Sequence, residues 1–395
     1  MTPTHAHHRG FSLIEMIVSV AILAFVVAGI SAVLIKQSQA SSAQNLQSDL
    51  EESGRLALLE IARAVRMAGY GIDPAAAFDF GRFNCTTPGN PATCNVTGRD
   101  RTDAPDELVV AWRDPMFARK VTTKTGAGPY TLTLDSALKA RVDAGRIVQL
   151  LCDGAENSSY MAATNTRNIG DSDITVRVLT AADGYFPITD PTDGCYATAT
   201  VLLVERTRYF VANDGDGVPT LWRDRAHGGP ERLFRGIEDL QLSYDIGQPP
   251  AGSRFAAGGA NAVAAPGCLD PNTAANIWSF GSCTGVAGAP DNNITPPDWR
   301  GDPYDAASRY TGHPANIRNV NIVVVARATR AMPAVNNLRT DRLGDALPAL
   351  LNRPARPADA FRRAIGALSE QPQNLLGRAN ILPPVFTGSM NVGGG

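Results

Sequence analysis

Apolar residues are concentrated near the start of the chain, and polar residues dominate the sequence that follows. From Phe11 to Ile35 the chain contains one charged residue, Glu15, and no proline. An α-helix rises about 1.5 Å per residue, so this run would extend ~37 Å as a helix. A bilayer core is about 30 Å thick. The pattern therefore predicts a helix that can span a membrane.

A second helical pattern follows without a break. Apolar residues recur mostly three or four positions apart, at Leu46, Leu50, Leu58, Ile61, Ala62, Val65 and Ala68. This spacing is typical of an amphipathic helix. No proline occurs between Pro3 and Pro74, so residues 36–70 are predicted to continue the first helix. The glycines of Ala68–Gly71 provide a C-terminal stop.

Beyond Pro74 the periodicity changes from helical to strand-like. Segments rich in Val, Leu, Thr and Tyr and bounded by Gly, Pro, Asp or Asn are typical of β-strands. They occupy Glu107–Arg113, Tyr130–Asp135, Arg146–Cys152, Ile174–Leu179, Ala199–Ala212, Thr220–Arg223, Ile237–Tyr244 and Val320–Ala328. A stretch rich in Gly, Ala and Pro, Gly247–Gly267, begins a loop-rich insertion that is predicted to last until Asn319.

The predicted fold class is therefore α+β. A long N-terminal helix, membrane-spanning over residues 11–35, would pack on a mainly antiparallel β-rich head formed by residues 71–395. The chain has 395 residues, 44% of them hydrophobic and 19% charged, which suffices for one large or two ordinary domains. A net charge of -2 provides no basic excess, so we do not expect nucleic acid as a partner.

The residues at the start of the apolar run form a specific motif. Gly10–Met16 reads GFSLIEM, in which a short polar leader ends in Gly and is followed by Phe, a small hydroxyl residue, two aliphatic residues and Glu. This motif resembles the prepilin motif of type IV pilins and type II secretion pseudopilins. The resemblance implies cleavage between Gly10 and Phe11 by a prepilin peptidase, followed by N-methylation of Phe11. The leader, residues 1–10, would be discarded with its histidine-rich tract, His5–His8.

A cleaved secretory signal is the alternative interpretation of a short leader before an apolar core. The apolar run is longer than a typical signal core, and no small-x-small cleavage site with a soluble start follows Ile35. The sequence continues into another helical pattern instead, which favours a retained membrane anchor.

Glu15 is unusual because an ionised side chain in a bilayer core costs roughly 2.5–3.5 kcal/mol. In the family that the motif resembles, this acid is thought to register each subunit by pairing with the N-terminal amine of its neighbour. Pairing of the amine with the Glu15 carboxylate would neutralise both buried charges at once. The alternative is a carboxylate that snorkels to the headgroups, because Glu15 lies only about 6 Å along the helix from Phe11.

Two further stretches narrow the resemblance. Leu58–Gly71, LLEIARAVRMAGYG, and the block Arg208–Ile246, which contains a Gly-rich turn and the strand sequence DLQLSY, are similar to PilW-like minor pilins. This resemblance implies a pilin-like head and assembly with other minor and major pilins in a priming or tip complex of a type IV pilus. The Cys268–Cys283 insertion and the Pro354–Gly395 tail depart from the family pattern.

The implied location is the bacterial inner membrane with the head in the periplasm, and then the pilus fibre at the cell surface. Two alternatives stay open at this point. A minor pseudopilin of a type II secretion system shares the N-terminal motif and the helix-plus-sheet plan. A tip adhesin or binding module is the other, because a large loop-rich insertion is a natural recognition surface.

The cysteines all lie beyond the apolar run. They are Cys85, Cys94, Cys152, Cys195, Cys268 and Cys283. An even number in an exported domain favours disulfides. Pairing of sequence neighbours would join the first to the second, the third to the fourth and the fifth to the sixth. No CxxC occurs in the sequence, which removes support for zinc ribbons and thioredoxin-type sites.

Metal and catalytic candidates are few. Asp214 and Asp216 in the turn Asn213–Pro219 have the alternating spacing that begins a calcium loop, but Asn, Asp and Gly are also favoured in a turn between strands. After leader removal His227 and His313 are the remaining histidines, and no nucleophile elbow or Walker loop occurs. We therefore expect neither an enzyme nor a bound cofactor.

Overall fold

The computed structural model of the protein describes most of the chain in nine stretches. They are residues 13–79, 104–152, 159–179, 198–225, 229–247, 277–280, 317–329, 345–351 and 353–376. The chain divides into two compact units, Met1–Asp49 and Leu50–Gly395.

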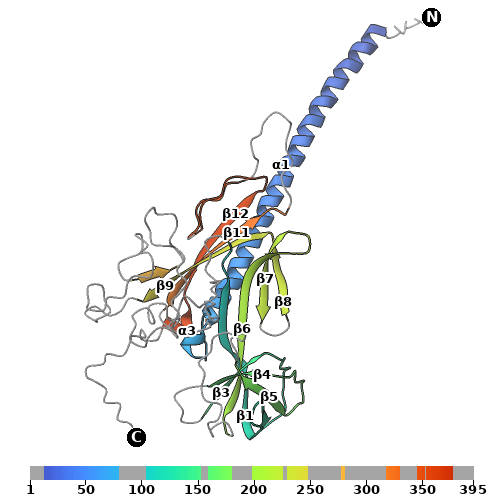
Figure 1. The fold of residues 1–395 in the computed structure, drawn as a ribbon. Helices are drawn as coiled ribbons and strands as arrows, with labels where there is room; N and C mark the ends of the chain where they lie inside the picture. The colour runs from blue at the N-terminus through green and yellow to red at the C-terminus, as the bar shows by residue number, and fades with distance from the viewer. Residues whose placement is uncertain are drawn as a thin grey trace, which may run out of the picture. The chain divides into compact units, whose positions relative to one another are not determined.

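The described part of the first unit is helical. Helix α1, Leu13–Met67, begins in this unit (Figure 1, blue) and continues into the second. Every side chain from Leu13 to Ser38 is exposed. The most apolar 18-residue window of the helix has a mean hydropathy of 2.8, and none of it is buried. By length and composition α1 can cross a membrane, as the apolar run predicts.

In the second unit, helix α1 buries one face. The fully buried residues of this face include Ala57, Ile61, Ala62 and Val65, and Ala68 directly after the helix is fully buried as well. Their spacing is that of an amphipathic helix. The helix ends at Met67, slightly before the predicted limit of residue 70. Gly69 follows with a φ of 77°, and its N–H donates to the carbonyl of Ala111 at 2.9 Å.

Strands β1 to β8 form the first sheet. Their bounds are Leu108–Thr125 (β1), Tyr130–Leu134 (β2), Ile147–Leu151 (β3), Ser159–Ala163 (β4), Asp173–Val178 (β5), Thr200–Asn213 (β6), Pro219–Arg225 (β7) and Gly229–Arg235 (β8). Neighbouring strands follow the order β1-β2-β5-β4-β3-β6-β7-β8, and all pairs are antiparallel. Because β1 also pairs with β6, the first six strands of this order close into a barrel, and β7 and β8 extend from β6.

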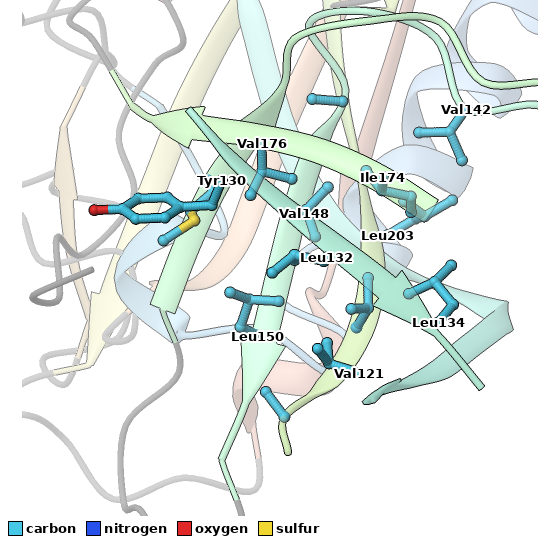
Figure 2. Packing of buried hydrophobic residues seen from close by; sticks show 14 of the residues in the cluster. Val121, Tyr130, Leu132, Leu134, Val142, Val148, Leu150, Ile174, Val176 and Leu203 are labelled. Carbon is cyan, nitrogen blue, oxygen red and sulfur yellow. The ribbon is translucent and has the colours of Figure 1, made fainter. Parts of the chain in front are cut away.

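The interior of this barrel is filled with apolar side chains. Figure 2 shows part of the cluster, with Leu132 and Leu134 of β2, Val148 and Leu150 of β3 and Val176 of β5 among the labelled residues. Burial alternates along β2, because successive side chains of a strand point to opposite sides. Barrels of about eight strands already have an interior that side chains can fill. A barrel of six strands therefore has a packed core and no channel.

Strand β1 bends between its two halves. Its pairing with β6 is regular up to Arg113, then shifts and resumes at Ala118. Within the bulge, Asp114 Oδ1 accepts the N–H of Met116 at 2.9 Å, and Phe117 returns to the barrel core. Bulges let a strand change direction. The second half of β1 therefore packs in the barrel, and the first half lies beside the C-terminus of α1.

Four strands form the second sheet. They are β9, Ile237–Gly247, β10, Ile277–Phe280, β11, Ile317–Arg327, and β12, Arg363–Glu370, in the antiparallel order β10-β9-β11-β12. Helix α1 lies close to this sheet. A Cβ atom on Gly54 would lie 3.6 Å from the Cβ of Ala326, and one on Gly366 would lie 2.7 Å from Leu58 Cδ1. Gly366 thus permits the close approach of helix and sheet, whereas the distance at Gly54 is an ordinary van der Waals contact.

Gly236 joins the two sheets between β8 and β9. Its φ is 82°, which favours glycine. Its N–H donates to the carbonyl of Pro219 at 2.7 Å, and its own carbonyl accepts the N–H of Arg327 at 2.6 Å. A Cβ at this position would lie 2.7 Å from the Arg327 carbonyl oxygen. The connection therefore requires a residue without a side chain.

Two short helices complete the described elements. A single 3-10 turn, η1, Pro74–Ala76, follows the end of α1. Helix α3, Gln373–Leu376, follows β12, and the side-chain amide of Asn374 donates to the carbonyl of Arg66 at 2.9 Å. The segment after β12 is thereby attached to the last turn of α1.

The α+β prediction is confirmed, with a long apolar N-terminal helix followed by an antiparallel β-sheet head. Each of the eight predicted segments overlaps a strand, but β4, β8, β10 and β12 are additional strands that the pattern does not predict. Strand β10 lies inside the predicted loop-rich insertion, and β12 lies in the divergent tail. Strand β1 continues to Thr125 although the predicted segment ends at Arg113, because Pro115 in the bulge interrupts the strand-like pattern.

Candidate processing and assembly site

The predicted cleavage point lies outside the described residues. Gly10, Phe11 and the tract His5–His8 all precede Leu13, where the described chain begins. Cleavage between Gly10 and Phe11 and methylation of Phe11 therefore stay predictions.

Glu15 lies in the first turn of α1 and is exposed. The hydroxyl of Ser19, one turn later, donates to the Glu15 backbone carbonyl at 2.7 Å. A carboxylate in the first turn is favoured by the partial positive charge of the helix N-terminus. Glu15 is also the sole acidic or basic residue between Leu13 and Ile35. Its side chain is thus accessible to a neighbouring helix end, as the proposed pairing requires.

A polar cluster that the sequence pattern does not predict ties α1 to the first sheet. Glu60 of α1 accepts hydrogen bonds from the Tyr209 hydroxyl at 3.1 Å and from Arg223 at 2.5 Å. Arg223 also donates to Glu231 of β8 at 2.5 Å. The partners of Glu60 lie on β6 and β7, which are far away in sequence, so the local helical pattern contains no signal for this contact.

Burial of Tyr209 changes its acidity. Its side chain is 2% exposed. Burial, followed by the charge of Glu60, raises the pKa of the Tyr209 hydroxyl above its ordinary value, and Arg223 opposes this only in part. The neutral hydroxyl is therefore a stable hydrogen-bond donor to Glu60 at physiological pH.

A cavity of about 360 Å³ lies beside this cluster, between α1 and strands β1, β6 and β7. Its lining combines charged, aromatic and apolar side chains. They are Glu60, Arg63, Ala64, Met67, Trp112, Pro115, Glu205, Thr207, Tyr209, Arg223 and Arg225. The sequence pattern gives Arg63 and Ala64 as helical but does not indicate that they line a cavity.

The turn between β6 and β7 contains the calcium candidates. Asp214 Oδ1 accepts the N–H groups of Asp216 and Val218, both at 3.0 Å. Asp214 Oδ2 lies 2.8 Å from Arg235, which also lies 2.9 Å from Asp216. Burial raises the pKa of Asp214, but the backbone N–H donors and Arg235 outweigh it and lower the pKa. A guanidinium neutralises both acids, which favours the turn interpretation over calcium.

The other candidates are placed only in part. Cys152 is 9% exposed and is disulfide-bonded, and its partner lies outside the described residues. Cys85, Cys94, Cys195, Cys268 and Cys283 lie there as well, as do His227 and His313. The predicted pairing of Cys152 with Cys195 stays a prediction. Within the described stretches, no group of three or more His, Cys, Asp or Glu side chains could hold a metal ion.

Comparison with known proteins identifies a methylation motif at the N-terminus of the chain. A family model described as the prokaryotic N-terminal methylation motif matches residues 5–31. No curated protein matches the chain. Among solved structures, the chain is similar to a type IV-like pilin from Thermus thermophilus, with 12% identity, coverage of 59% of this chain and 86% of that chain, and a TM-score of 0.18. A likeness at this TM-score identifies neither family nor function.

The methylation motif covers the residues whose chemistry the sequence singles out, namely Gly10, Phe11 and Glu15. It stands at the start of a helix long and apolar enough to cross a membrane. An antiparallel β-sheet head follows this helix in sequence. A methylation motif, an apolar helix and an antiparallel β-sheet head therefore follow one another along the chain.

Proposed function

We propose that this chain is a PilW-like minor pilin that assembles with other minor and major pilins in a priming or tip complex of a type IV pilus. The observation that carries the proposal is the methylation motif at residues 5–31. The motif begins before helix α1 and overlaps the start of the helix. The apolar side chains of α1 from Leu13 to Ile35 are all exposed. Such a surface requires a bilayer or neighbouring helices to cover it.

Processing would prepare the chain for assembly. A prepilin peptidase would cleave between Gly10 and Phe11 and leave a charged amine at the new N-terminus, which N-methylation does not neutralise. Until assembly, α1 would anchor the protein in the inner membrane with the head in the periplasm. Afterwards the same apolar surface would lie against helices of neighbouring subunits in the fibre.

Glu15 would fix the axial position of neighbouring subunits in this assembly by pairing with an opposite charge. An ionised carboxylate in an apolar environment is costly unless it is paired. The Phe11 amine of a neighbouring subunit supplies the opposite charge, so one axial position of the neighbour is preferred over others. The role is structural, and we propose an assembly subunit and not an enzyme.

Deletion of the gene in its native cell tests this function. If the chain belongs to a priming complex, fibres should not start without it, so we expect shearing to recover few or no fibres, and the loss should be reversed by the intact gene. Secretion of folded proteins to the medium should be unaffected. Normal piliation combined with a secretion defect would instead identify a minor pseudopilin of type II secretion.

A further inference from the structure

The cavity between α1, β1, β6 and β7 has a lining to which the proposed assembly role assigns no function. Its volume of about 360 Å³ lies within the range of about 300–1,000 Å³ of small-molecule sites. Every lining residue belongs to the second unit, from Glu60 to Arg225. The cavity is therefore a property of the head alone.

Part of the lining consists of charges that are already fixed in place. Glu60 is held by Tyr209 and Arg223. Glu205 is held by Arg146, which lies behind it and is 7% exposed. These carboxylates can accept further hydrogen bonds, and the guanidinium of Arg223 donates them. A ligand that satisfies such a mixed lining must offer both donors and acceptors, which is the property of a sugar with several hydroxyl groups.

The remaining charge on the lining is positive. Arg63 is exposed and has no ion-pair partner in the part of the chain that the structure describes. Arg225 is 3.8 Å from Glu231, which is farther than a hydrogen bond, and Glu231 is already bonded to Arg223. A carboxylate on the ligand would accept charge-assisted hydrogen bonds from these two guanidinium groups.

Trp112 provides a third feature. It is half-buried on β1, and Pro115 and Met67 add apolar surface to the same lining. An indole ring offers a flat apolar face together with one N–H donor. The axial C–H groups of a sugar ring form a complementary flat apolar face.

We propose that this cavity binds a sugar unit that carries a carboxylate, of the uronic acid type. Arg63 and Arg225 would hold the carboxylate, Trp112 the ring face, and Glu60, Glu205 and Arg223 the hydroxyl groups. A simple acidic peptide side chain fits less well, because it offers no hydroxyl donors to the two glutamates. The assignment goes beyond the proposed assembly role and does not depend on it.

Calorimetric titration of the full-length protein in detergent tests the assignment. The probes are D-galacturonate and D-glucuronate, with D-galactose and D-glucose as neutral counterparts. We expect saturable binding of at least one uronate, and binding of its neutral counterpart that is weaker by about tenfold, the effect of one charge-assisted hydrogen bond. Absence of saturable uronate binding, or equal binding of the neutral sugar, would overturn the proposal.

Matched variants locate the site. Arg63→Gln should weaken uronate binding by about tenfold. Arg66→Gln, which removes the same charge from the same helix but outside the cavity, should leave it unchanged; Arg66 pairs with Glu370 instead. Trp112→Phe should weaken binding of both the uronate and the neutral sugar. Unchanged affinity in Arg63→Gln, or equal binding of a tetraglutamate peptide by the wild type, would refute the site. Arg63→Gln should still enter pili, so a negative result here leaves the assembly role standing.

Discussion

The two halves of helix α1 both carry apolar side chains, but these side chains are exposed in the first half and mostly buried in the second. From Leu13 to Ile35 all of these side chains are exposed, whereas Ile61, Ala62 and Val65 are fully buried in the second unit. One continuous helix therefore meets two environments. The second half is covered by the sheets of the second unit, and the first half is not covered by any residue that the structure describes. The following substitutions test this division.

The largest effect is expected at Glu15, which should matter for assembly and not for the fold. Glu15→Ala makes the segment more apolar, so membrane insertion should be intact. The neighbouring Phe11 amine would then lack its counter-charge, and deletion of one partner of a buried pair costs about 3–5 kcal/mol. Incorporation into fibres should fail or fall strongly, as measured by immunoblots of sheared pili beside the membrane fraction.

Glu15→Gln sharpens this test because it keeps the shape and most of the hydrogen-bonding capacity of the side chain without its charge. It should behave like the alanine variant if charge is decisive. Normal recovery of both variants in sheared fibres would identify Glu15 as a tolerated snorkelling acid.

The second effect concerns the buried half of the helix. Ile61→Ala removes a fully buried side chain and should lower the free energy of unfolding of the head by about 2–5 kcal/mol. Ile22→Ala is the matched control, because Ile22 is 59% exposed on the same helix. It should change the stability of the head by less than about 0.5 kcal/mol. Chemical unfolding of the detergent-solubilised protein measures both, and similar losses in the two variants would contradict the division.

A smaller effect is expected at the junction of the two sheets. Gly236→Ala combines a left-handed backbone with a contact of 2.7 Å to a carbonyl oxygen, so we expect a loss of about 2–3 kcal/mol. Gly217→Ala is the control, with a φ of 75° but open space around its Cβ. It should lose only the strain of about 1 kcal/mol. Equal thermal shifts in the two variants would show that the close contact has no consequence.

The smallest effect is expected at the contact between Glu60 and Tyr209. Tyr209→Phe should cost about 1 kcal/mol, the value of one hydrogen bond. Since the folded-state pKa of Tyr209 is raised above its ordinary value of 10.0, its contribution is complete below about pH 10 and is lost as the pH rises toward the folded-state pKa. The wild type should therefore lose stability more steeply above pH 10 than Tyr209→Phe, and parallel pH profiles from denaturant titrations would contradict this.

The sequence predicts the elements whose signal is local. The apolar run, the three-to-four spacing from Leu46 to Ala68 and the glycines after Met67 suffice for α1 and its end. Alternation of apolar and polar residues suffices for β2 and β5. In each of these elements the environment of a residue follows from its immediate neighbours in sequence.

Features that depend on distant pairing are not predicted. Closure of the barrel requires β1 to meet β6, and the cavity requires Trp112 to lie beside helix residues such as Arg63. Strand β8 has mostly exposed side chains and polar sequence, and every side chain of β4 is buried, so neither alternates in a way that a pattern can detect. Gly236 is recognisable as a turn residue, but its contact with Arg327 is not.

The intact mass of the protein from its native membrane tests the central claim most directly. Processing at the methylation motif predicts a chain that begins at Phe11 and carries one additional methyl group. Gly10→Val should crowd the cleavage site and retain the leader, which provides the reference mass. A wild-type chain that keeps residues 1–10, or one that begins beyond Ile35, would contradict the account.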